Sequence, residues 1–147
     1  MKKILFLAVL ALAMANCKPA AQPAATEVWK CDFKGSYKDK GGAAVPFVWK
    51  VTWTVDKDEK GTIAGASTEE GAASTTEGTC DAKNCKITET YTSGEEKGKK
   101  FYWSGDYTDS ATGNENVLVT TFKGTYGLSE SDRTSGGEWS AQADCKR

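Results

Sequence analysis

The sequence predicts an all-β domain, specifically a small antiparallel up-and-down β-barrel of about eight strands, with a β-sandwich as the alternative. Three observations support this fold class. Glycine is abundant while proline is limited to three residues. Apolar and polar side chains alternate along short segments, and turn-forming residues separate these segments. Short strands that follow one another in this way favour a meander that closes on itself.

The clearest strand covers residues 47–55, where apolar side chains recur at every second position. One face would carry Phe47, Trp49, Val51, Trp53 and Val55. A period of two over this length is typical of a strand with one buried face. The same pattern predicts a first strand over residues 29–37 and a last strand over residues 139–145. Weaker patterns predict five more strands, at residues 62–67, 74–80, 86–92, 100–108 and 117–126.

An aromatic-polar-Gly-polar-Tyr pattern occurs three times, at residues 33–37, 103–107 and 122–126. In a strand, the aromatic residue, the glycine and the tyrosine share one face. The glycine would let the strand bend, and the two flanking rings would cover it. The repeat therefore favours a coiled barrel with an aromatic interior.

The cysteines predict two disulfides that staple this barrel. Cys31 and Cys145 fall on the inward faces of the first and last strands, which are neighbours in a closed barrel. Cys80 and Cys85 flank a short turn. We therefore expect the pairs Cys31–Cys145 and Cys80–Cys85, out of the three pairings that four cysteines allow.

The start of the chain has the features of a bacterial export signal over residues 1–16. Lys2 and Lys3 precede an apolar stretch, and small residues lead to Cys17. The run Met14-Ala15-Asn16-Cys17 resembles the lipobox of bacterial lipoproteins, although that family prefers Leu in place of Met14 and Gly, Ala or Ser in place of Asn16. This resemblance covers only the first 17 residues.

The resemblance implies a diacylglycerol on the sulfur of Cys17 and a further acyl group, such as palmitate, on its amino group. Lys18 in the next position implies sorting to the outer membrane. Lipidation of Cys17 would leave four cysteines for two disulfides. Residues 17–26 would then be a lipidated cysteine with an Ala/Pro tether, and residues 27–147 the barrel domain. Cleavage after Ala15 is the alternative, which would give a soluble periplasmic or secreted protein.

Composition argues against several function classes. The chain carries 19 basic and 20 acidic residues, so no basic surface for nucleic acid is expected. It contains no histidine, which removes the commonest catalytic base and zinc ligand. We expect no cofactor, no metal and no enzymatic activity. Most carboxylates are expected to be solvated turn residues, namely Asp56, Asp58, Glu59, Glu69, Glu70, Glu95 and Glu96.

The candidate ligand-binding residues are those expected to face the interior. They include all five tryptophans, namely Trp29, Trp49, Trp53, Trp103 and Trp139. Glu89 shares the phase of Ile87 and Tyr91, so it would face inward too, unless its strand lies at the rim. An eight-stranded barrel can be filled by side chains or hold one small apolar ligand, and the sequence leaves both open.

These features favour a membrane-anchored, non-enzymatic binding domain for a small apolar ligand or for a protein of the envelope or the host. An envelope-displayed inhibitor or a structural lipoprotein is the alternative. Small lipoproteins that inhibit lysozyme share a faint similarity around Trp29-Lys30-Cys31 and Cys145. The chain is longer and lacks that family's Ser-Gly-x-x-Tyr loop, so it is not assigned to it.

Overall fold

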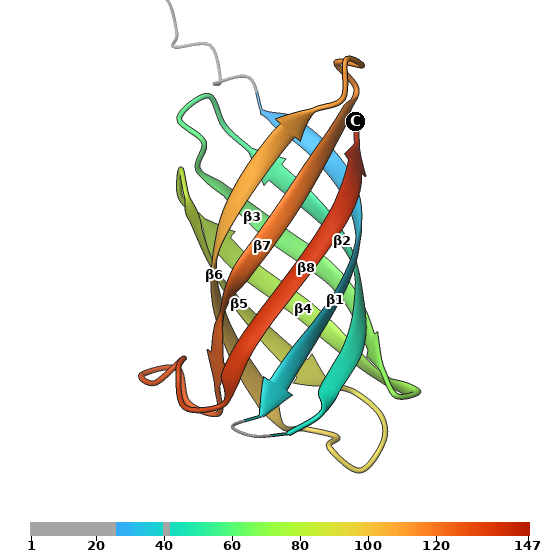
Figure 1. Cartoon of the computed structure of the whole chain (residues 1–147), viewed down its shortest axis with the longest axis vertical. Helices are drawn as coiled ribbons and strands as arrows, with labels where there is room; N and C mark the ends of the chain where they lie inside the picture. Colours follow the sequence, from blue (N-terminus) through green and yellow to red (C-terminus); the bar gives the residue numbers. More distant parts are fainter. Residues whose placement is uncertain (1–25, 40–41) are drawn as a thin grey trace, which may run out of the picture.

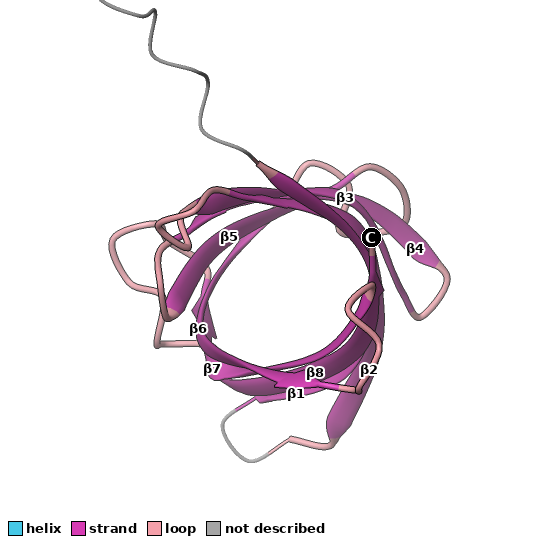
Figure 2. Ribbon diagram, turned by 90° about the horizontal axis from the view of Figure 1, so that it is seen from above, coloured by secondary structure: helices cyan, strands magenta, loops and turns pink. Residues whose placement is uncertain are grey.

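The protein forms a closed barrel of eight antiparallel strands in a computed structural model that describes residues 26–39 and 42–147. Each strand pairs with the next along the chain, and the last pairs with the first (Figures 1 and 2). The strands are β1 (Glu27–Asp39), β2 (Ala44–Val55), β3 (Gly61–Glu69), β4 (Ala72–Cys80), β5 (Asn84–Tyr91), β6 (Lys100–Ala111), β7 (Val117–Gly127) and β8 (Gly137–Lys146). The barrel is therefore confirmed over the sandwich.

Every strand that the alternation predicts is present, and most extend beyond the predicted limits. The first strand, for example, was expected over residues 29–37 and spans Glu27–Asp39. The strands are long and tilted relative to the barrel axis (Figure 1). Glu70 and Gly71 form the β3–β4 turn with φ values of 44° and 85°. A positive φ at both central residues suits the twist of a tight hairpin.

Both predicted disulfides are confirmed. Cys31 lies directly opposite Cys145 in the β1–β8 pairing, so this bond joins the two strands that close the barrel. Cys80 and Cys85 are paired across the β4–β5 hairpin. The export signal, Cys17 and the tether as far as residue 25 lie outside the described residues.

Two of the three glycines of the aromatic repeat are covered by rings, and the nearest rings are not the flanking ones that the sequence predicted. A Cβ at Gly35 would lie 2.5 Å from Cζ of Phe47, and one at Gly105 would lie 2.5 Å from Cζ2 of Trp139. Both rings come from other strands, because the strong coiling of a small barrel brings side chains of other strands over the bare backbone. Gly124 instead meets the backbone of Ser104. The prediction was therefore right about covered glycines and wrong about the source of the cover.

The two ends of the barrel differ. We call one end the mouth: β1 begins there, β8 ends there, and the connections 56–60, 81–83 and 112–116 surround it. In Figure 1 this is the upper end. We call the other end the base, which carries the β3–β4 turn and the connections 92–99 and 128–136.

The disulfide positions predict unequal contributions to stability. Cys31 and Cys145 are 114 residues apart, whereas Cys80 and Cys85 are 5 apart. In the loop-entropy model, losing the long cross-link lowers the free energy of unfolding by about 5 kcal/mol, and losing the short one by about 2 kcal/mol. We expect this order for the double variants Cys31→Ala/Cys145→Ala and Cys80→Ala/Cys85→Ala in urea denaturation. Equal losses would contradict a closing role for Cys31–Cys145.

Candidate functional site

Aromatic rings fill the middle of the barrel. Trp49, Trp103 and Trp139 meet one another with ring centroids 5.2 to 5.6 Å apart. Phe47 packs on Trp49 at 4.7 Å, and Phe122 stacks on Trp139 at 5.7 Å. These are the separations of rings in direct contact. The middle of the barrel is therefore a packed core, and a binding site must be sought at its ends or outside.

The mouth holds a pocket of about 750 Å³. Its volume lies within the range of small-molecule sites, roughly 300 to 1,000 Å³. The lining residues come from the start of β1, the end of β2, the far half of β6, the start of β7 and two connections. They are Glu27, Trp29, Trp53, Val55, Asp56, Glu59, Ala82, Lys83, Asp106, Tyr107, Thr108, Asp109 and Leu118.

The aromatic part of this pocket continues the packed core. Trp53 and Tyr107 meet edge to face, with centroids 4.9 Å apart at 89°. Tyr107 in turn packs on Phe122, 5.7 Å away in the core below. Trp53 is buried. The rings at the mouth are thus held by the core and are not free to collapse into the pocket.

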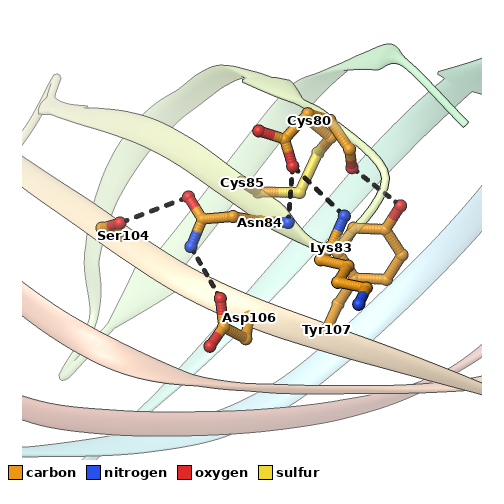
Figure 3. Close-up of a disulfide and its surroundings, with 8 residues drawn as sticks. Cys80, Lys83, Asn84, Cys85, Ser104, Asp106 and Tyr107 are labelled. Atoms are coloured by element: carbon orange, nitrogen blue, oxygen red, sulfur yellow. Dashed lines mark hydrogen bonds between the residues drawn. A yellow bond between two sulfur atoms is a disulfide. The ribbon is translucent and has the colours of Figure 1, made fainter.

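The β4–β5 hairpin forms one wall of the mouth and is fixed onto β6 (Figure 3). The Tyr107 hydroxyl donates to the backbone oxygen of Asp81 at 2.9 Å, and the Tyr107 backbone N–H donates to Lys83 O at 2.9 Å. The Asn84 side chain donates to Asp106 at 3.0 Å. Burial, with nearby carboxylates, raises the pKa of Tyr107 to about 12, so its hydroxyl stays a donor. The hairpin thus provides a fixed wall.

The mouth is strongly acidic. Five carboxylates line it against one lysine, Lys83. Asp56 accepts backbone N–H bonds from Lys60 and Asp58, which lower its pKa, so this side chain is engaged in its own turn. Burial raises the pKa of Asp109, and the charge of Glu59 adds to that effect, although a hydrogen bond from Thr120 opposes it. Glu59 and Asp109 thus place like charges in the lining of one pocket.

Glu89 faces the interior, as its phase predicts, and is fully buried. Its Oε1 accepts a hydrogen bond from the Ser74 hydroxyl at 2.5 Å, whereas Oε2 has no hydrogen-bond partner. Burial raises the pKa of Glu89. Three nearby donors oppose that rise in pKa, namely the hydroxyls of Ser67 and Ser74 and the indole of Trp103. Of these, the Ser67 hydroxyl and the Trp103 indole do not reach hydrogen-bond geometry. Glu89 thus lies below the packed rings, away from the mouth.

Glu69 was expected to be a solvated turn residue, and this was wrong. Its two carboxylate oxygens accept hydrogen bonds from the hydroxyls of Tyr37 and Tyr91. Glu69 ends β3 on the inward phase of Ser67, so its side chain points across the base instead of into the turn. Burial and the bond to Glu69 raise the pKa of Tyr91. This cluster closes the base of the barrel with polar contacts.

The structure separates the residues that the sequence grouped as ligand-binding candidates. Trp29 and Trp53 line the mouth, whereas Trp49, Trp103 and Trp139 lie in the packed middle. Sequence reasoning missed Tyr107, Asp109 and Leu118 as mouth residues. The phase of the strand contained the signal for the first two, since positions 103, 105, 107 and 109 share one face of β6.

Among the described residues, no group of three or more Cys, Asp or Glu side chains is placed to hold a metal ion. The same part of the chain contains no helix of the length and apolarity needed to cross a membrane. Comparison of the chain with protein-family models, with curated proteins and with solved structures found no match.

Burial of Glu89 predicts a measurable pH dependence. Because its pKa is raised in the folded barrel, the protonated carboxyl favours folding below the ordinary value of 4.5, and this contribution is lost as the pH rises through the folded pKa. The amide of Glu89→Gln resembles the protonated acid and does not titrate. The free energy of unfolding of Glu89→Gln relative to wild type should therefore rise from about pH 4 to about pH 8.

Urea denaturation across this pH range measures the effect. Glu77→Gln on the exposed face of β4 is the matched control. Parallel pH profiles for Glu89→Gln and wild type would show that the carboxyl titrates normally and is not buried as described.

Proposed function

We propose that this protein is a non-enzymatic binding protein of the bacterial envelope whose ligand site is the mouth of the barrel. The observation that carries the proposal is the pocket of about 750 Å³, walled by rigid aromatic rings above a packed core. Fixed walls favour binding because little conformational freedom is lost when a ligand enters. The sequence led us to expect an apolar ligand inside the barrel. The proposed ligand site is instead at the open end of the barrel.

The mouth suits a small molecule with an apolar body. Trp29, Trp53 and Tyr107 line it with rings, although the two tryptophans are largely buried, and Val55 and Leu118 add aliphatic surface. Polar and charged residues make up the rest of the lining, so an apolar body would lie among groups that can fix its orientation. Lining residues from β1, β2, β6 and β7 meet here only because the barrel is closed, so the site depends on the whole fold.

The proposed anchor would place this mouth near the membrane. Glu27 lines the pocket and is also the first residue of β1, directly after the tether. If Cys17 carries lipid, nine residues, Lys18 to Thr26, separate it from the barrel. Fully extended, such a segment reaches about 30 Å. We therefore propose that the mouth faces the outer membrane that holds the anchor.

A protein partner is the second candidate, and the 128–136 connection at the base favours it. Arg133 donates to the backbone oxygens of Ile87 and Trp103, both at 3.0 Å, and lies over the Tyr102 ring. This loop is thus held against the barrel while Leu128 stays 67% exposed. A single exposed apolar side chain is ordinary on a protein surface, so it is the fixed position of this loop, on the end away from the tether, that makes it the second candidate.

The anchor is tested by replacing the proposed lipidation site. Wild type should fractionate with membranes, and its intact mass should exceed that of the polypeptide from Cys17 by a diacylglycerol and an acyl chain. Cys17→Ser should lose both properties while keeping two disulfides. Mature protein that begins at Asn16 without added mass would contradict the anchor and favour secretion.

The site is tested by native mass spectrometry of the full chain, produced in a bacterial host and purified gently. We expect wild type to retain a small molecule that is lost on denaturation. Val55→Trp should fill the mouth and abolish retention. Thr54→Trp, on the outward face of the same strand, should retain the ligand. A ligand-free wild type would count against a small molecule and favour the loop at the base, and retention by Val55→Trp would exclude the mouth.

A further inference from the structure

A guanidinium from the chain itself contacts two residues of the mouth. The Cζ atom of Arg147 lies 5.3 Å from the centre of the Trp29 ring, over its face. Nη1 of Arg147 lies 2.6 Å from Oε1 of Glu27. Trp29 and Glu27 both line the pocket. A ring face with a carboxylate beside it is the arrangement that binds organic cations.

This cation seat, formed by Trp29 and Glu27, is organised before any ligand arrives. Oε2 of Glu27 accepts a hydrogen bond from the Trp29 indole at 3.2 Å, which leaves Oε1 to face the cation. Trp29 is only 5% exposed and belongs to the core cluster, and Arg147 lies over its ring face. Arg147 itself is attached to the neighbouring loop by its backbone N–H, which donates to Asn116 O at 3.1 Å. Its side chain can therefore leave the seat without displacing β8.

The rest of the mouth also favours a cation. Glu59 and Asp109 lie close enough for the charge of Glu59 to raise the pKa of Asp109. A positive group bound between them would relieve that repulsion. Lys83 is the single basic residue in the lining. An anionic ligand would meet the opposite conditions throughout the pocket.

We propose that the mouth binds a ligand with an apolar body and a guanidinium or ammonium group, and that this group replaces the guanidinium of Arg147 on Trp29 and Glu27. The inference rests on the proposed function and names its ligand class. Arg147 acts as a built-in competitor that keeps the seat covered until such a ligand displaces it. Ligand affinity is therefore lower than the seat itself would allow.

The test uses three probes with the same aromatic group: 2-phenylethylguanidinium, the neutral 2-phenylethanol and the anionic 3-phenylpropionate. Their affinities for the full chain are measured by NMR from the indole N–H signals of Trp29 and Trp53. The guanidinium should bind about tenfold more tightly than the alcohol, as expected for combined ring and carboxylate contacts. The carboxylate should bind most weakly.

Variants at the seat separate competition from simple attraction. Arg147→Gln should tighten binding of 2-phenylethylguanidinium about fivefold because the competitor is gone, whereas Arg147→Lys should stay near wild type. Glu27→Gln should weaken binding about fivefold, and Glu77→Gln on the outer face of β4 should not change it. Glu27 and Glu77 are both exposed, so neither change threatens the fold.

Three results would overturn the inference. If the alcohol binds as tightly as the guanidinium, the mouth does not select a cation, while its role as a binding site stands. If Arg147→Gln leaves the affinity unchanged, the ligand does not replace the guanidinium of Arg147. If none of the probes shifts the signals of Trp29 and Trp53, the cation seat is excluded. The retained-ligand experiment with Val55→Trp then decides separately whether the mouth is a site at all.

Discussion

The rest of the structure depends on how eight strands are filled. A closed barrel of this size has an interior just wide enough for side chains. Here the large rings occupy it, with Trp49, Trp103 and Trp139 in mutual contact. Such packing works only if the barrel is closed, and the Cys31–Cys145 bond joins the first strand to the last. Closure of the barrel thus brings the rings into contact. The rings in turn fill the interior of the closed barrel.

A packed middle leaves the polar groups to the two ends and gives each end a different character. At the base, Glu69 binds the hydroxyls of two tyrosines and closes the interior. At the mouth, the carboxylates have no matching set of basic residues in the lining, and a pocket remains open beside the aromatic rings. This asymmetry is the reason that we propose a binding role for the mouth. It also gives a role to the guanidinium of Arg147, which compensates part of the negative charge that a ligand would otherwise meet.

Much of the fold could be predicted because strand phase is a local property. Alternation placed Cys31 and Cys145 on the same face as their neighbouring tryptophans, and closure then followed from their pairing. The same logic placed Glu89 inside correctly. It was not applied to Glu69, because the third strand was expected to end at residue 67. The strand continues to Glu69, which keeps its inward phase. Strand phase could not separate a packed interior from a hollow one, because the orientation of the rings arises only from contacts between distant strands. The position of the 81–83 connection over β6 depends on such contacts too.

The most direct test of a packed interior is hydrogen exchange at the tryptophan indoles, followed by NMR on the full chain. The indole N–H of Trp49 is buried and has no hydrogen-bond partner, so only the absence of water can protect it. A packed interior predicts that it exchanges slowly, as does Trp139, which donates to Ser104 O and Thr125 O. Exchange at Trp49 as fast as that of an indole in the urea-unfolded chain would mean that water fills the barrel and would contradict a packed interior.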